Sequence, residues 1–417
     1  MKKYNNNFSA TKSFVIGGAV GPPKNLRTPK RMKEIADSGI NVIILLGGIP
    51  TVKETIEYMD VAQTAGIKIL PPDKRCYSAF MGGQNDVDAS EKSIKAIVKD
   101  YSDHPGLFAY SIYDEPSCKQ FTNLAKVLRL LEKNDKNHFG FINLFPGYAS
   151  PAALGSPNFK EHVKSYVDIV KPSVLCYDHY SLRVNKFDTG WYKDLEIIRE
   201  ESRRVKIPFW IYVLSEGIKK NLRVPTRPEI LWQANSALAY GARGILWFCY
   251  WTPQATTEAH HNAMIDLKGN KTPLYDYVRE ENIFLKDAGN KLLSWDNSYI
   301  QRYVKSKPVA GGKSPVVKPA GKNFDLTIGT FTKENLVRIV CVNDSVDKSL
   351  ALSLVTNPEY KFLKIAASID ATKSKEKNIE LELKPGGCII LEFILSSCKS
   401  PKLKDAQKGI QPQRGLT

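Results

Sequence analysis

The chain has 417 residues, of which 42% are hydrophobic and 25% are charged, and its formal net charge is +17. This length suits a large domain joined to a smaller one, and no stretch approaches the roughly 20 apolar residues that a membrane helix needs. Seven scattered cysteines without CxxC spacing argue against a disulfide framework and against a zinc site.

The basic charge bears on binding partners rather than on the fold. We find no motif of stacking aromatics among lysines and arginines, so we expect neither a nucleic-acid partner nor a membrane. Two explanations of the charge are left: an anionic polysaccharide as the binding partner, or an ordinary solvated surface. The start Met1-Lys2-Lys3 is basic like a signal peptide, but no apolar segment follows. We expect a secreted or periplasmic protein whose export signal is absent from this sequence, with a cytoplasmic protein as the alternative.

Eight apolar runs recur along the first 300 residues, and a helical pattern follows each of them. The runs are almost continuously hydrophobic, as expected for a parallel sheet that is covered on both faces. They span residues 14–19, 42–46, 67–70, 107–113, 139–144, 174–177, 208–214 and 244–251. Eight such units in succession predict an α/β fold, a (β/α)₈ barrel over residues 1–296.

Start and stop signals support the intervening helices. Thr28 precedes Pro29 as a helix cap, and Gly39 ends that helix. Thr226 and Glu229 have the spacing of a capping box. A doubly wound open sheet is the alternative, but the glycines after the first run lack the GxGxxG spacing that such sheets often carry.

The composition changes after about residue 296. Residues 305–322 are rich in Lys, Pro and Gly, which indicates a linker or extended loop. Strand-like runs without helices between them follow and predict a small antiparallel β-sandwich over residues 297–397. Turn residues at Pro385-Gly386-Gly387 separate two of these runs, 379–383 and 388–395. Residues 398–417 are polar and are expected to form a disordered tail.

Carboxylates stand where chemistry takes place in such barrels, at the carboxyl ends of the strands. The fourth run ends in Asp114-Glu115, and Pro116 prevents the strand from continuing. The seventh run is followed by Glu216. Strands four and seven lie on opposite sides of a barrel mouth, so Glu115 and Glu216 can face each other. Two opposed carboxylates suit cleavage of a glycosidic bond, with aromatic rings from Tyr113, Tyr180, Trp247 and Trp251 as walls for the sugar.

Tyr113-Asp114-Glu115-Pro116 and Ser215-Glu216-Gly217 resemble the corresponding segments of retaining clan A glycoside hydrolases. The overall plan is similar to that of β-galactosidase-like barrels of the family 42 type. The resemblance covers about residues 13 to 290. It implies that Glu115 is the acid/base, that Glu216 is the nucleophile, and that a β-glycoside of an oligo- or polysaccharide is cleaved with retention. We expect no cofactor and no metal.

The chain departs from the clan at Asp114, where the clan usually has an Asn that contacts the sugar 2-hydroxyl. An ionised Asp can accept that hydroxyl but donates nothing, so the identity of the sugar stays open. Asp114 would also help to keep Glu115 protonated. At the end of the sixth run, Tyr177 or His179 could orient the nucleophile.

Other functions fit less well. A Schiff-base aldolase would need a lysine at the end of a barrel strand, and none of the eight runs ends that way. A metal-dependent hydrolase would need histidines at strand ends, and His260-His261 are adjacent in a loop, poorly placed to bind one ion. The main alternative is a non-catalytic glycan-binding protein on a glycosidase-like barrel.

Overall fold

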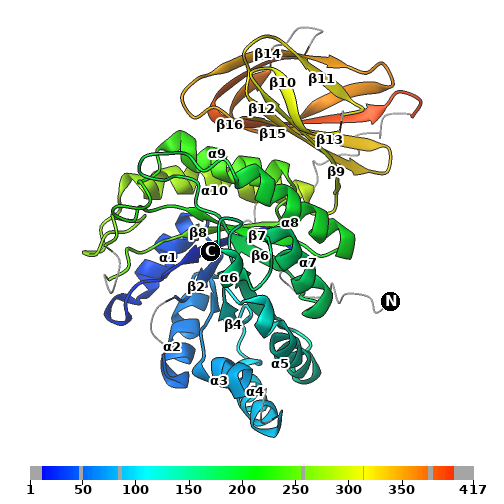
Figure 1. The fold of residues 1–417 in the computed structure, drawn as a ribbon. Helices are drawn as coiled ribbons and strands as arrows, with labels where there is room; N and C mark the ends of the chain where they lie inside the picture. The colour runs from blue at the N-terminus through cyan, green and yellow to red at the C-terminus, as the bar shows by residue number, and fades with distance from the viewer. Residues whose placement is uncertain are drawn as a thin grey trace, which may run out of the picture.

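The computed structural model describes residues 12–46, 50–82, 87–254, 259–312, 314–373 and 379–398. Its first part is a parallel sheet of eight strands in the order β3-β2-β1-β8-β7-β6-β5-β4 (Figure 1). Parallel bridges from Ile69 to Leu107 and from Pro72 to Ser111 join the two edges. The predicted (β/α)₈ barrel is confirmed. The strands are β1 (Val15–Ala19), β2 (Val42–Ile44), β3 (Lys68–Leu70), β4 (Tyr110–Asp114), β5 (Gly140–Leu144), β6 (Leu175–Asp178), β7 (Phe209–Leu214) and β8 (Gly244–Phe248).

Helices surround the barrel, and their caps agree with the sequence. Thr28 accepts a hydrogen bond from the Arg31 backbone at the start of α1, and Thr226 and Glu229 form a capping box at α9. None of the helices in the described ranges is both long enough and apolar enough to cross a membrane. The helices are α1 (Pro29–Asp37), α2 (Val52–Gln63), α3 (Lys74–Gly82), α4 (Val87–Tyr101), α5 (Phe121–Asn134), α6 (Pro151–Leu154), α7 (Phe159–Ile169), α8 (Trp191–Val205), α9 (Arg227–Ala239) and α10 (Pro273–Leu292).

Side chains fill the barrel interior, so the barrel is a packed core rather than a channel. The ring of Trp210 lies 5.8 Å from that of Phe108 and 6.1 Å from that of Phe141, measured between centroids. These residues and Tyr212 belong to an inner hydrophobic cluster, whereas their neighbours along each strand pack outward against the helices. Access to the barrel is therefore restricted to its two ends.

The C-terminal part is a curled antiparallel sheet. The strands β9 (Asp296–Val304), β10 (Lys307–Gly311), β11 (Val317–Ala320), β12 (Leu326–Lys333), β13 (Leu336–Asn343), β14 (Leu350–Thr356), β15 (Tyr360–Lys373) and β16 (Ile379–Leu395) form it. They pair as β10-β9-β12-β13-β16-β14-β11, with β15 also on β16. The linker expected over residues 305–322 is wrong, because β10 and β11 lie within it. The predicted turn at Pro385-Gly386-Gly387 is also wrong, because β16 runs through it. The expected tail lies outside the described residues apart from Cys398.

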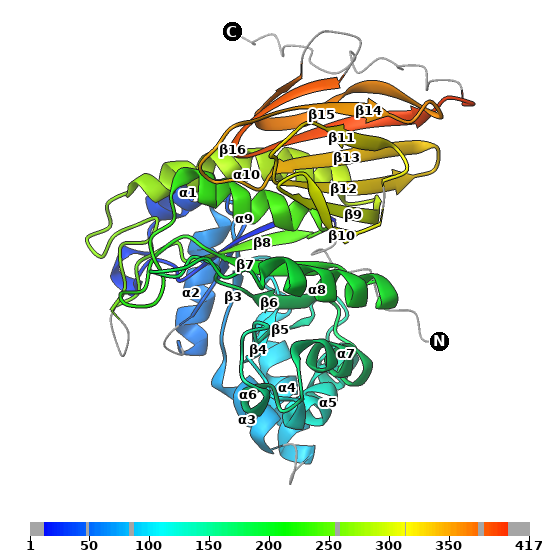
Figure 2. The same cartoon turned by 45° about the horizontal axis from the view of Figure 1, so that its top comes forward.

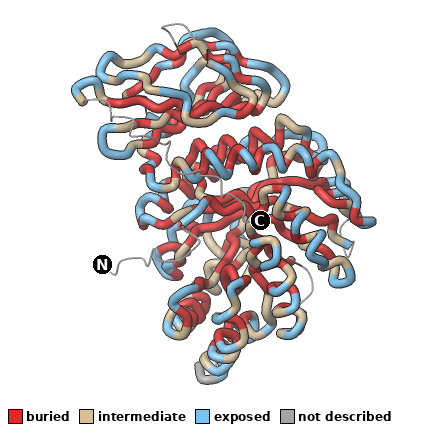
Figure 3. Tube along the Cα trace, turned by 180° about the vertical axis from the view of Figure 1, so that it is seen from behind, coloured by how far each residue is buried: buried red, intermediate tan, exposed pale blue. Residues whose placement is uncertain are grey.

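Helix α9 lies between the barrel and the C-terminal sheet (Figure 2). Every residue from Glu229 to Ala239 is buried, and Figure 3 shows this buried band from behind. A helix that is buried all round needs partners on both faces. The Asn235 side chain donates to the Gly386 carbonyl oxygen at 3.0 Å, and the Asn297 side chain donates to the Ala239 carbonyl oxygen at 2.9 Å. The C-terminal sheet therefore covers one side of the barrel and leaves the mouth, where the strands end, to the loops.

Candidate active site

Two backbone irregularities shape the end of β4. The pairing with β5 shifts between Ser111 and Tyr113, so that Asp114 lies opposite Asn143. The next residue, Glu115, has a φ of +49°, a left-handed conformation that is costly for a side chain with a Cβ. Its backbone N–H donates to the Asn143 carbonyl oxygen at 2.8 Å. Strained backbone of this kind persists where the surroundings fix it, and here it places two consecutive carboxylates at the barrel mouth.

Asp178 at the end of β6 joins these carboxylates. The Asn143 amide donates to Asp114 Oδ1 at 3.2 Å and to Asp178 Oδ1 at 2.9 Å. Asp178 in turn shares a hydrogen bond with the Glu115 side chain. Asp178 is buried, Glu115 is half-buried and Asp114 is exposed. We call Asp114, Glu115, Asn143 and Asp178 the carboxylate cluster.

The electrostatics of this cluster favour protonated carboxyl groups. Burial, followed by the charge of Asp114, raises the pKa of Glu115 to about 7, against a smaller lowering by the hydrogen bond with Asp178. The pKa of Asp114 is raised because protein atoms surround it on most sides although it keeps contact with solvent. Burial and then the charge of Glu115 raise the pKa of Asp178 well above its usual range. A carboxyl group that holds its proton near neutral pH can act as a general acid.

Glu216 lies in a separate set of contacts after β7. Its side chain has no exposed surface, and its Oε1 is 3.0 Å from His260 Nδ1. The Cys249 thiol lies beside it and hydrogen-bonds to it. The loops after β7 and β8 are joined here, since the His261 N–H donates to the Gly217 carbonyl oxygen at 2.7 Å. The contact with His260 was not expected, because the sequence shows it only as a loop histidine.

The prediction that four aromatic side chains form the walls of a sugar site is partly wrong. Trp247 is fully buried on the outside of the barrel, and its indole N–H donates to Asn282 of α10 at 2.8 Å. Tyr113 also points outward, since its ring stacks on Tyr77 of α3 with centroids 5.9 Å apart. Trp251 is 3% exposed and lies beneath the Arg31 guanidinium.

Tyr180 lies at the barrel mouth, as predicted from the sequence. Its ring centroid is 5.5 Å from that of Phe248, and it packs against both the inner and the outer hydrophobic clusters. It is also close enough to Asp178 and Asp114 for their charges to raise its pKa, although burial is the larger cause. Tyr180 is therefore the one predicted aromatic that the structure brings to the carboxylate cluster.

The two residues expected to orient the nucleophile have their observed contacts with other residues. Tyr177 is fully buried between the barrel and α7, where it packs against Phe159. His179 Nδ1 pairs with Asp194 Oδ2 at 2.7 Å, and the same oxygen accepts the Gly147 N–H at 2.8 Å. His179 therefore helps to hold the loop after β5 in place.

Sequence reasoning missed Asp178, and strand alternation could have found it. Neighbouring residues of a strand face opposite sides. Cys176 lies in the inner cluster and Tyr177 in the outer one, so Asp178 points inward. Tyr148 was also missed. It is 42% exposed and lies under the Arg183 guanidinium at 4.5 Å, and Asp178 is near enough to influence its pKa. Within the described ranges, no group of three or more His, Cys, Asp or Glu side chains could hold a metal ion.

The hydrogen bond from Asp178 gives a test of the cluster. This bond lowers the pKa of Glu115, so a side chain without a donor should raise that pKa above 7. We expect Asp178→Val to move the titration midpoint of Glu115 to higher pH, because the ionised carboxylate then lacks a hydrogen-bond donor. Asp178→Asn, which retains a donor, should leave the midpoint near its original position. The ¹³C chemical shift of the Glu115 carboxyl, followed against pH by NMR, measures both. An unmoved midpoint in a folded Asp178→Val variant would contradict this role.

Comparison with known proteins identifies the fold. No protein-family model matches the chain, and no curated protein is similar to it in sequence. A catalytic mutant of a GH42 β-galactosidase from G. stearothermophilus aligns over 91% of this chain and 98% of that chain, with a TM-score of 0.58 and 9% identity. A family 5 glycoside hydrolase from Bacteroides vulgatus aligns over 92% and 90%, with a TM-score of 0.58 and 11% identity.

Other similar structures show that the fold alone does not specify an activity. The β-galactosidase from Marinomonas ef1 aligns with a TM-score of 0.52 and 8% identity over 67% of this chain. The aligned part spans only 62% of the length of that enzyme. An α-amylase from H. orenii also aligns, with a TM-score of 0.52 and 9% identity over 91% of this chain and 99% of that one. At these identities the likeness concerns the fold alone. The chain therefore has a TIM-barrel fold followed by a C-terminal β-domain, and it shares this fold with the glycoside hydrolases named above.

Proposed function

We propose that this protein is a glycoside hydrolase that cleaves β-glycosidic bonds, with Glu115 as the general acid/base. One observation carries the proposal: the Glu115 carboxyl lies at the carboxyl end of the barrel with its pKa raised to about 7. Such a group is protonated often enough at neutral pH to donate to a departing glycosidic oxygen, and ionised often enough to accept a proton from water.

Glu216 is the proposed nucleophile. Its carboxylate would attack the anomeric carbon while the bond to the leaving oxygen breaks and that oxygen takes the proton of Glu115. Water would then attack the glycosyl-enzyme as Glu115 recovers a proton, which gives net retention of configuration. Glu216 has no exposed surface, so this step requires the groups packed around it, including His260, to move when the substrate enters.

The substrate class is a proposal in two parts. The similar structures include β-galactosidases, which supports a galactose-containing substrate. The net charge of +17 supports an anionic polymer that carries sulfate or uronic acid groups. An intact polysaccharide is too large to enter the cytoplasm, so a protein that cleaves one must meet it outside. We therefore also propose that the protein is secreted or periplasmic.

A non-catalytic glycan-binding protein is the second candidate. The burial of Glu216 favours it, because a carboxylate that substrate cannot touch performs no chemistry. In that case the carboxylate cluster and Tyr180 would contact a glycan without cleaving it.

Hydrolysis assays separate the two candidates. The wild-type chain should be incubated with neutral, sulfated and uronic-acid polysaccharides and with aryl β-glycosides, and the first-formed anomer followed by NMR. We expect hydrolysis of at least one β-linked substrate with a β-anomeric product. Binding without hydrolysis across the panel would instead support the glycan-binding protein, and an α-anomeric first product would exclude the double displacement.

A further inference from the structure

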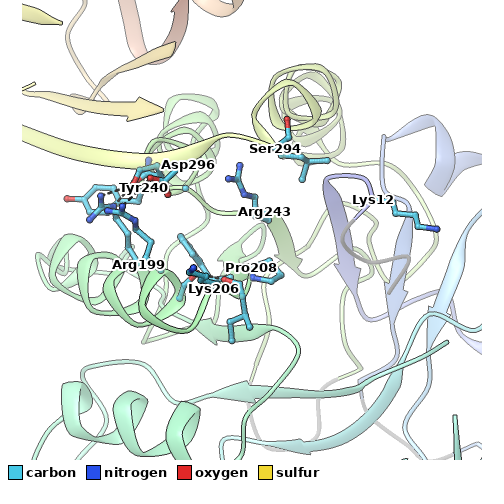
Figure 4. Close-up of a pocket in the computed structure, with 15 residues that line it drawn as sticks. Lys12, Arg199, Lys206, Pro208, Tyr240, Arg243, Ser294 and Asp296 are labelled. Atoms are coloured by element: carbon cyan, nitrogen blue, oxygen red, sulfur yellow. Dashed lines mark hydrogen bonds and ion pairs between the residues drawn. The ribbon is translucent and has the colours of Figure 1, made fainter. Parts of the chain in front are cut away.

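A cavity of about 610 Å³ lies at the end of the barrel opposite the mouth (Figure 4). Pro208 and Phe209 at the start of β7 and Arg243 just before β8 line it. The C-terminal half of α8 forms one wall. The junction of α10 and β9 forms another, through Leu293, Ser294, Asp296 and Asn297. The site therefore lies at the amino ends of the strands and shares no lining residue with the carboxylate cluster. Its volume falls within the usual range for small-molecule sites, roughly 300–1,000 Å³.

Positive charge dominates the lining of this cavity. Asp296 is the one acidic residue among its lining residues, and the cationic residues are Lys12, Arg199, Arg203, Lys206 and Arg243. Two of the cations are neutralised in place, since Arg199 pairs with Glu196 at 3.1 Å and Arg203 with Asp296 at 3.2 Å. No carboxylate of the described chain lies within 4.0 Å of the other three. The lining therefore carries three positive charges without an ion-pair partner.

Arg243 is the deepest of these charges. Its two terminal nitrogens donate to the carbonyl oxygens of Leu292 and Trp295. Burial lowers its pKa to about 10, and Asp296 offsets this only in part. Solvent still reaches the side chain, which is only partly buried by surface area, and Figure 4 shows it between Arg199 and Lys12. Leu292 is the last residue of α10, so the negative end of that helix dipole offsets part of the charge of Arg243. An anion nearby would offset the remainder.

The dipole of α8 explains only part of this charge. Basic side chains favour the carboxyl end of a helix, which accounts for Arg203 in the last turn and for Lys206 just beyond it. It does not account for Lys12, which precedes β1, or for Arg243, which precedes β8. Cations from three separate segments therefore line one hollow.

We propose that this cavity binds a small anion that carries a phosphate or sulfate group. Arg243 would contribute its charge at the inner wall, and the flexible ammonium groups of Lys12 and Lys206 would close on the oxygens from the exposed side. The site would act independently of glycoside cleavage, because it lies at the other end of the barrel.

Calorimetric titration of the full chain with inorganic phosphate and with sulfate at low ionic strength tests this proposal. We expect saturable binding of one anion per chain by the wild type. The double substitution Lys12→Gln/Lys206→Gln should weaken it about 10²- to 10⁴-fold, since it removes two charge-assisted contacts and each of them contributes about 10- to 100-fold in affinity. Lys12 and Lys206 are exposed, so the variant should keep the wild-type melting temperature.

Lys193→Gln is the matched control, because Lys193 is an exposed lysine on the same helix but near its other end. It should bind phosphate like the wild type. A titration with a hexose phosphate distinguishes the two sources of the anion. Tighter binding than that of phosphate indicates a sugar ester, and equal binding indicates the free anion. The proposal is overturned if the wild type binds neither phosphate nor sulfate saturably, or if the double variant binds them as tightly as the wild type.

Discussion

Substitution of Glu115 by Gln should lower kcat on an unactivated β-glycoside by about 10²- to 10⁴-fold, the usual contribution of a general acid. The amide keeps the shape of the side chain but cannot transfer its proton to the leaving oxygen. Initial rates of the purified variant and wild type on one oligosaccharide measure this loss. Near-normal turnover would remove Glu115 from the mechanism.

The choice of leaving group separates lost acid catalysis from general damage. A nitrophenyl group departs readily without a proton, so Glu115→Gln should slow its release much less than the release of a sugar. An equal loss on both substrates would indicate a distorted site rather than a missing acid. Glu57→Gln is the matched control, since Glu57 is an exposed glutamate on α2 and its substitution should leave both rates unchanged.

The barrel could be predicted because its signals are local. Each of the eight strands lies in a short, nearly continuous apolar run, which is typical of parallel strands covered on both faces. The helix caps at Thr28 and Thr226 were equally visible, because a cap depends on residues only three positions apart. Both caps are formed in the structure.

The direction of side chains was predicted less well. In a continuously apolar run, the sequence does not show which side chains face the barrel interior and which face the helices. The sequence therefore did not indicate that Tyr177 faces outward and Asp178 inward. In β4 the shift between Ser111 and Tyr113 turns Asp114 inward and Tyr113 outward. That shift depends on pairing with β5, and no local pattern reveals it. The sequence therefore indicates which strands end in Glu115 and Glu216, whose catalytic roles stay a prediction, whereas it does not indicate which way the expected wall residues face.

The turn predicted at Pro385-Gly386-Gly387 was wrong because the need for these glycines comes from tertiary packing, which the local sequence does not show. A Cβ on Gly386 would lie 2.3 Å from the Pro228 carbonyl oxygen, and one on Gly387 would lie 2.4 Å from that of Asp370. These glycines allow β16 to approach α9 and β15 closely, a tertiary requirement that resembles a turn signal in the sequence. Pairing over long separations likewise turned the expected linker into β10 and β11.

Substitution of Glu216 by Ala should reduce hydrolysis by about 10³-fold or more, because the first displacement then has no carboxylate to attack the anomeric carbon. The rate on an activated aryl β-glycoside measures the loss. Removal of a buried side chain can also destabilise the fold, so the melting temperature must be recorded beside the rate. Glu281→Ala is the matched control. Glu281 is a fully buried glutamate on α10, away from the mouth, so that variant loses a buried side chain of the same size and should retain turnover per folded molecule.

Rescue by azide distinguishes a nucleophile from a structural glutamate. In the Glu216→Ala variant the vacated space should admit azide, which would attack the anomeric carbon as the aryl leaving group departs. A β-glycoside would then give an α-glycosyl azide, because only one displacement has occurred. Formation of this product by the variant, and not by the wild type, would assign the nucleophile to Glu216. An inactive but folded variant that azide does not rescue would show that Glu216 supports the loops around His260, and would favour glycan binding over hydrolysis.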